Sequence, residues 1–134
     1  GPGQTMRHGF GLIRTMLEHA RFGKPLEVWG DGENVRDYIY IEDVVAACLR
    51  LIALPGESGS YNLGSGLGHS INQVRSVVEA VSGKTLQTIY SPARGVDVHS
   101  VVLDGTRLQT ALGWQPGFEL TQGVERTWEW VRSL

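Results

Sequence analysis

Two arginines in loop segments are the residues of this chain best suited to act on a charged ligand. Arg36 follows a turn at residues 30–34, and Arg94 lies inside a polar segment at residues 91–97. A guanidinium group presents several N–H donors in a rigid fork that matches phosphate oxygens. Two such groups converging from separate loops could therefore hold a diphosphate. The alternative for each arginine alone is an ordinary solvated or salt-bridged surface residue.

A glycine-rich segment at residues 64–68 offers a second way to bind phosphate. It stands between an expected strand and an expected helix, which is the context of dinucleotide-binding loops. Its third glycine comes one residue too early for that motif, and no βαβ unit with a distal acid surrounds it. The spacing therefore favours a plain connection between strand and helix over an NAD site.

Metal and nucleophile motifs are missing from the sequence. There is no His-Glu-x-x-His, no pair of Cys-x-x-Cys motifs and no Gly-x-Ser-x-Gly elbow. Residues 31–42 have the length of a calcium-binding loop, but Arg36 occupies the position that requires glycine. We therefore expect no metal site.

Composition describes an ordinary globular protein. Residues 1–134 are enough for a single domain, with 41% hydrophobic residues and a net charge of -2. That charge gives no electrostatic case for binding nucleic acid or an anionic membrane, and the apolar runs are too short to span a bilayer. The only cysteine, Cys48, excludes an intrachain disulfide and is interpreted as a small core residue. A reducing, cytoplasmic location is the simplest expectation.

Hydrophobic periodicity predicts five helices. The first carries an apolar stripe and ends at a glycine, and its residues are Met6, Phe10, Ile13, Leu17, Ala20 and the terminating Gly23. A capping box of Ser70 and Gln73 begins the third. The second, fourth and fifth are predicted to begin at caps, which are Asp43, Asp104 and Thr121.

Short strands are predicted at residues 26–29, 35–41, 60–63 and 86–90, with an extended or irregular segment at 101–103. The first two strands flank a five-residue turn, which predicts a hairpin of open register. The mixture of short strands and helices indicates an α/β fold.

The segment at residues 30–43, Gly-Asp-Gly-Glu-Asn-Val-Arg-Asp-Tyr-Ile-Tyr-Ile-Glu-Asp, resembles a block of the NAD-dependent epimerase/dehydratase family. More narrowly, it is similar to UDP-glucose 4-epimerase-like extended short-chain dehydrogenases, which act on sugar nucleotides. Five further blocks match in the same order, at residues 1–4, 61–66, 94–97, 112–116 and 120–130. The resemblance implies a partial extended short-chain dehydrogenase fold. This would be the small C-terminal, substrate-binding domain without the complete Rossmann domain.

The resemblance also assigns site residues. It implies that Arg36 and Arg94 grip the diphosphate and that Asp97 accepts hydrogen bonds from the ribose hydroxyls. Val28 and Trp29 would lie against the uracil, although a core or hairpin aromatic is the alternative for Trp29. The motif's Asp37 is explained sufficiently by hydrogen bonding within the strand.

Catalytic residues of the family are absent. Its members bind NAD through a Gly-x-x-Gly-x-x-Gly loop and use a Tyr-x-x-x-Lys pair, and no tyrosine here is followed by lysine four residues later. We therefore expect a substrate-binding portion without cofactor or activity of its own. The alternatives are a non-catalytic module that binds a sugar nucleotide or a protein, or a folded gene fragment without activity. Which sugar and which reaction are involved depends on residues outside this chain.

A partner is expected for the same reason. In the family, the helix after Asp43 and the strand at Tyr61 pack onto the NAD-binding domain. Their apolar faces would need other cover here, because large exposed apolar patches usually mark interfaces. The resemblance therefore favours a homo-oligomer or pairing with a complementary N-terminal half.

Overall fold

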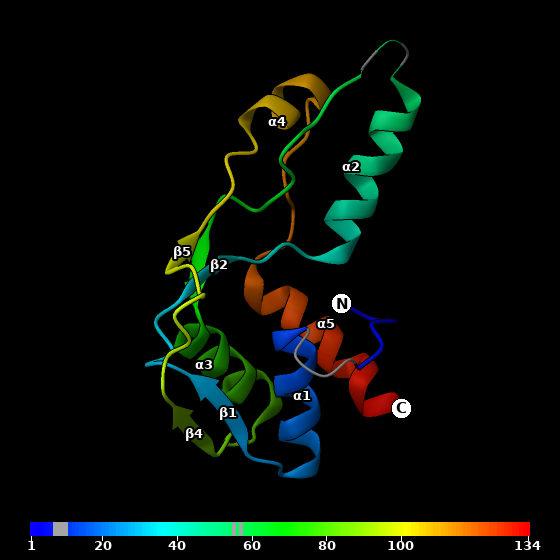
Figure 1. Ribbon diagram of the computed structural model, residues 1–134. Coiled ribbons are helices and arrows are strands. Elements are labelled where there is room, and N and C mark those ends of the chain that lie inside the picture. The colour runs from blue at the N-terminus through cyan, green and yellow to red at the C-terminus, as the bar shows by residue number, and fades with distance from the viewer. Residues whose placement is uncertain (7–10, 55, 57) are drawn as a thin grey trace.

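The computed structural model describes residues 1–6, 11–54, 56 and 58–134 of the chain, and Figure 1 shows their arrangement. The described helices are α1 (Leu12–Phe22), α2 (Ile41–Ala53), α3 (Ile71–Ser82), α4 (Thr106–Leu112) and α5 (Leu120–Ser133). The described strands are β1 (Leu26–Trp29), β2 (Val35–Asp37), β3 (Gly68–Ser70), β4 (Thr88–Ser91) and β5 (Ser100–Val101). The α/β class and the mixture of short strands with about five helices are confirmed.

The lower half of Figure 1 is built around three helices, α1, α3 and α5, with the β1–β4 pair beside them. Each helix has apolar residues at three- and four-residue steps, which places them on one buried stripe. Of the predicted α1 stripe, Met6 is exposed and Phe10 lies outside the described residues. We call the buried residues here the main cluster; they are Met16, Leu17, Ala20, Leu26, Val28, Val74, Val78, Leu86, Val124, Trp128 and Val131.

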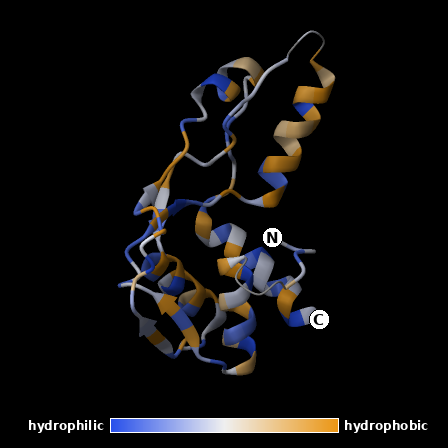
Figure 2. Cartoon of the chain, in the orientation of Figure 1, coloured by the Kyte–Doolittle hydropathy of each residue, from blue (hydrophilic) through white to orange (hydrophobic). Residues whose placement is uncertain are grey.

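The upper half of Figure 1 holds α2 and α4 and is packed much more thinly. Its buried residues, which we call the minor cluster, are Ala47, Leu108 and Trp114. Large apolar side chains remain exposed along α2, and Figure 2 shows how much of this helix is hydrophobic. The prediction that Cys48 is a core residue is wrong: its thiol lies on this exposed helix, because nothing in the described chain covers that face.

The two sheets are small, and they join segments that are far apart in the sequence. β1 pairs in parallel with β4, while β2 lies between antiparallel β3 and parallel β5. The predicted hairpin of β1 with β2 is therefore wrong, since each strand pairs with a later segment instead. Residues 60–63 form no strand, so that prediction is also wrong.

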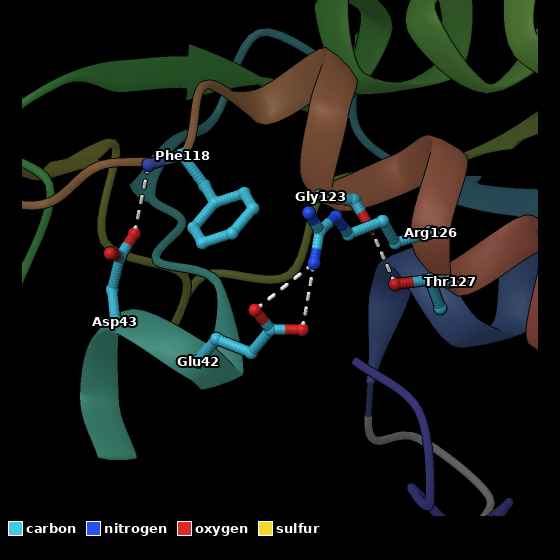
Figure 3. A network of polar contacts seen from close by, with 6 residues as sticks. All are labelled: Glu42, Asp43, Phe118, Gly123, Arg126 and Thr127. Atoms are coloured by element: carbon cyan, nitrogen blue, oxygen red, sulfur yellow. Dashed lines mark hydrogen bonds and ion pairs between the residues drawn. The ribbon is translucent and has the colours of Figure 1, made fainter. Parts of the chain in front are cut away.

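A buried carboxylate joins the two halves. Asp43, in the first turn of α2, is 5% exposed and accepts hydrogen bonds from the backbone N–H groups of Gly117 and Phe118, at 2.8 and 3.1 Å. Beside it, Arg126 of α5 donates to Glu42, and Figure 3 shows this pair together with the hydrogen bond from Phe118 to Asp43. The prediction that Asp43 caps α2 is wrong. The cap position is Tyr40, and the Asp43 carboxylate accepts hydrogen bonds from the segment before α5 instead.

Helix ends follow local rules only in part. The capping box of Ser70 and Gln73 is confirmed, as is the glycine end of α1 at Gly23. The predicted cap at Thr121 is wrong, because Glu119 takes that position two residues earlier in a capping box of its own. Gly105 replaces Asp104 as the cap of α4, although the Asp104 carboxylate still accepts the N–H of Thr106 at 2.9 Å.

Candidate functional site

The segments that carry Arg36 and Arg94 run side by side. One leads from β1 through residues 30–34 to β2, and the other leads from β4 through residues 92–99 to β5. At their start, next to β1 and β4, a hydrogen bond from the Gly30 N–H to the Ser91 carbonyl joins them at 2.8 Å. At their end, next to β2 and β5, a hydrogen bond from the Val35 N–H to the His99 carbonyl joins them again at 2.8 Å. Parallel pairing of β1 with β4 and of β2 with β5 thus brings together two loops distant in sequence.

Three of the predicted site residues form one group. Arg94 donates from Nε and Nη2 to the two carboxylate oxygens of Asp97, at 3.0 and 3.1 Å. The same guanidinium carbon lies 5.4 Å from the centroid of the Trp29 ring, within the range of a cation–π contact. Trp29 is 40% exposed and so is not the core aromatic of the alternative interpretation. A planar cation is therefore held in place between a carboxylate and an indole.

Arg36 and Val28 occupy more internal positions. Arg36 is half-buried in β2, opposite Val101 of β5, and its Nη1 donates to the Val35 carbonyl at 2.7 Å. Val28 is 3% exposed and its side chain belongs to the main cluster. Any ligand contact at Val28 would accordingly involve its backbone rather than its side chain.

The glycine-rich segment at residues 64–68 is already occupied by an internal anion. The Asp37 carboxylate accepts the N–H groups of Ser65, Gly66 and Leu103 at 2.8, 3.0 and 3.2 Å, and the Ser65 hydroxyl at 2.6 Å. A Cβ at Gly64 would overlap the same carboxylate. These N–H groups are the ones a phosphate would need, so the segment does not fit a dinucleotide.

Asp37 is also electrostatically distinct. Burial raises the pKa of its carboxyl, but the hydrogen bonds from Ser65, Gly66 and Leu103 outweigh burial and leave that pKa below its ordinary value. The carboxylate form is therefore the one the fold stabilises. This agrees with the interpretation that hydrogen bonding within the fold explains Asp37.

Sequence reasoning missed Asn72, which contacts the first of these loops and strand β4 from the first turn of α3. Its amide donates to the carbonyl of Asp31, and its side-chain oxygen accepts from the hydroxyl of Tyr90. The nearby capping box fixes where α3 begins, but the sequence does not indicate which loop lies opposite that end.

Comparison with known proteins identifies the family. The family model described as the NAD dependent epimerase/dehydratase family matches residues 1–64. The UDP-glucose 4-epimerase of Mycolicibacterium smegmatis is 30% identical over 133 residues, covering 99% of this chain and 42% of the relative. The chain belongs to the NAD-dependent epimerase/dehydratase family, and the recognition of it as a C-terminal part of such a protein is confirmed.

Solved structures agree in fold. The UDP-glucose 4-epimerase of Thermotoga maritima with UDP-glucose has a TM-score of 0.91 and 34% identity, covering 99% of this chain and 43% of that one. MoeE5 in complex with UDP-glucuronic acid and NAD has a TM-score of 0.89 and 32% identity, covering 99% and 44%. The chain thus spans about two fifths of the length of the relatives it matches, and its fold is part of the extended short-chain dehydrogenase fold. In the described residues, no helix is long and apolar enough to cross a bilayer.

Proposed function

We propose that this chain is the substrate-binding portion of a nucleotide-sugar epimerase or dehydratase and that its ligand is a UDP-sugar. The observation that carries the proposal is the Arg94 guanidinium, held between Asp97 and the Trp29 ring in a loop that runs beside the segment of Arg36. Structures similar to this chain contain UDP-glucose or UDP-glucuronic acid, which supports the same ligand class.

The diphosphate would be bound by the two arginines. Each hydrogen bond to a charged group contributes about 1.5–3 kcal/mol, so two guanidinium groups would account for most of the affinity. The Asp97 pair uses two N–H groups of Arg94 and holds the remaining donors in a fixed plane. Asp97 would then accept the ribose hydroxyls, and the base would lie against Trp29 and the backbone at Val28.

Catalysis would require residues that this chain does not contain. Its sequence has neither a Tyr-x-x-x-Lys pair nor the Gly-x-x-Gly-x-x-Gly loop through which the family binds NAD. In this proposal the chain binds and orients the sugar nucleotide, and a complementary N-terminal half supplies the cofactor and the proton-transferring tyrosine.

The exposed face of α2 is the proposed contact for that half. Four large apolar residues recur at four-, four- and three-residue steps along it, namely Ile41, Val45, Leu49 and Ile52, with exposures of 42, 49, 63 and 82%. Such a stripe in water usually marks an interface. A second copy of the chain is the other candidate occupant.

Calorimetric titration with UDP tests the binding proposal. We expect Arg94→Ala to weaken UDP binding by about tenfold to a hundredfold, the loss of one to two charged hydrogen bonds. The matched control is Arg132→Ala. It removes an exposed arginine in the last turn of α5, outside the proposed site, and should leave the affinity for UDP unchanged. Wild-type protein that fails to bind UDP, or an Arg94 variant that binds like wild type, would overturn the proposal.

Turnover assays test the requirement for a second half. The chain mixed with NAD and UDP-glucose should give no product, and product should appear when a half carrying Tyr-x-x-x-Lys is co-expressed. Product from the purified chain alone would contradict the division of labour.

A further inference from the structure

We propose that Asn72 is a positioning residue that holds the turn before Arg36 at a fixed separation from the strand that leads to Arg94. The inference rests on the proposed nucleotide site, and it assigns to that site a residue that touches neither arginine in any contact described above. Asn72 lies in the first turn of α3, between the two residues of the Ser70–Gln73 capping box that fixes the start of the helix.

Its side chain binds the first loop. The Nδ2 amide donates to the Asp31 carbonyl at 2.9 Å and to the Glu33 carboxylate at 2.6 Å. The backbone N–H of Asn72 donates to the Gly32 carbonyl at 3.1 Å. Three successive residues of the turn between β1 and β2 are thus tied to one asparagine, and this turn separates Trp29 from Arg36.

Its other side-chain atom binds the strand that leads into the second loop. The Tyr90 hydroxyl donates to Asn72 Oδ1 at 2.9 Å. Tyr90 stands in β4 opposite Val28, one residue before Ser91, and Arg94 follows three residues later. One amide group therefore uses its donor end for the loop of Arg36 and its acceptor end for the strand that leads to Arg94.

The fit between α3 and the first loop is close. Gly32 is buried and has φ of +80°, and a Cβ there would come within 2.5 Å of Asn72 Oδ1. Both the backbone conformation and the space favour glycine at this position. A loop seated this tightly has little freedom to shift while the amide is in place.

The consequence is geometric. A diphosphate spans a fixed distance, so two guanidinium groups bind it well only when their loops keep one separation. Leucine at position 72 has the same branched skeleton, but its side chain can neither donate to the first loop nor accept from Tyr90, and only the backbone hydrogen bond to Gly32 remains. The loops would then adopt several separations, and affinity would fall without loss of either arginine.

The test is UDP titration of Asn72→Leu. We expect its Kd for UDP to rise about tenfold, with a smaller change for uridine, because the diphosphate is the part that depends on the spacing. Asn62→Leu is the matched control: the Asn62 amide also donates to a backbone carbonyl, that of Asp104 at 3.2 Å, but in the upper half. It should leave UDP affinity unchanged.

Two further variants separate the ends of the amide. Tyr90→Phe removes the hydrogen bond to Asn72 Oδ1 alone, and Glu33→Ala removes one of the two side-chain contacts of Asn72 Nδ2. Each should weaken UDP binding less than Asn72→Leu, and adding Tyr90→Phe to Asn72→Leu should cost no more, because the two share one network. A purely structural role would lower thermal stability and affect UDP and uridine alike, which would overturn the inference.

The two proposals fail in distinguishable ways. Wild-type binding of UDP with no change in Asn72→Leu refutes the positioning role alone. Absence of UDP binding in the wild type refutes the nucleotide site. Amide hydrogen exchange at residues 31–33 and 91–94 then tests the positioning role, which predicts faster exchange in Asn72→Leu than in the wild type. Unchanged exchange in Asn72→Leu would refute it there too.

Discussion

The lower and upper halves of the molecule bury their side chains to different extents. The main cluster is enclosed by α1, α3 and α5 together with the β1–β4 pair, and most of its members are almost inaccessible. The minor cluster lies between α2 and α4, while the opposite face of α2 keeps its apolar residues in water. The main cluster thus has the burial pattern of an enclosed core, whereas the upper half has that of a region that another surface completes.

The largest expected effect tests this difference with the same substitution in both halves. Leu17 and Leu108 are 0 and 1% exposed. We expect Leu17→Ala to lower the free energy of unfolding by about 4 kcal/mol and Leu108→Ala by about 2 kcal/mol, because the cavity in the main cluster has less freedom to collapse. Urea unfolding followed by circular dichroism measures both. A larger cost for Leu108→Ala would show that the upper half is the better-packed one.

Next in size is the connection between the halves. Asp43→Ala would leave the N–H groups of Gly117 and Phe118 without their acceptor inside the protein. The expected cost is about 2–3 kcal/mol, that of buried hydrogen bonds to a charged group. Asp43→Asn keeps one acceptor oxygen and should cost less. Equal stability of the alanine variant and the wild type would mean that the halves are joined by other contacts.

The connection at Asp37 gives a pH-dependent effect. Its pKa is lowered in the folded chain, because hydrogen bonds from Ser65, Gly66 and Leu103 outweigh the effect of burial. The stabilisation is therefore present above the ordinary aspartate pKa of about 3.9 and is lost as pH falls through the lower, folded value. Unfolding free energies measured from pH 6 to pH 3 should fall more steeply for wild type than for Asp37→Asn.

A second variant makes that measurement specific. Glu129→Gln removes an exposed carboxylate from α5, far from the glycine-rich segment in sequence. Its pH profile should keep the wild-type slope below pH 4. A wild-type slope in Asp37→Asn would show that other carboxylates account for the acid sensitivity.

Sequence predicted the features that depend on near neighbours. The capping box of Ser70 and Gln73 and the glycine end of α1 follow from residues within one turn, and both are confirmed. Strand partners were predicted wrongly, because β1 and β2 lie only five residues apart but pair with segments far along the chain. Local spacing says nothing about the competition between such distant partners.

The same limit applies to the site. The resemblance identified Trp29, Arg94 and Asp97, which the fold brings into one group, but spacing alone would have left them separate. The sequence predicts a local cap at Asp43, because its role as an acceptor depends on residues 117 and 118, which are remote in sequence. The sequence does not indicate the role of Asn72, because its partners come from a turn and a strand that are distant from each other in sequence.

The smallest expected effect on folding concerns the exposed face of α2. Ile52 is 82% exposed, so Ile52→Ser should change the free energy of unfolding by less than about 0.5 kcal/mol. The same variant should weaken association, because it removes apolar area from the proposed interface. Light scattering across a concentration series measures this for the chain alone, and co-purification measures it for a complementary half.

Matched substitutions locate the surface. Leu134→Ser changes an apolar residue that is 62% exposed at the end of the chain, beyond α5 and away from the α2 stripe, and should alter neither property. If Ile52→Ser and Leu134→Ser lower association equally, the effect is general hydrophobicity rather than the α2 face. If Ile52→Ser destabilises the chain by more than about 1 kcal/mol, that face is already covered within the chain, because an uncovered side chain has little burial to lose.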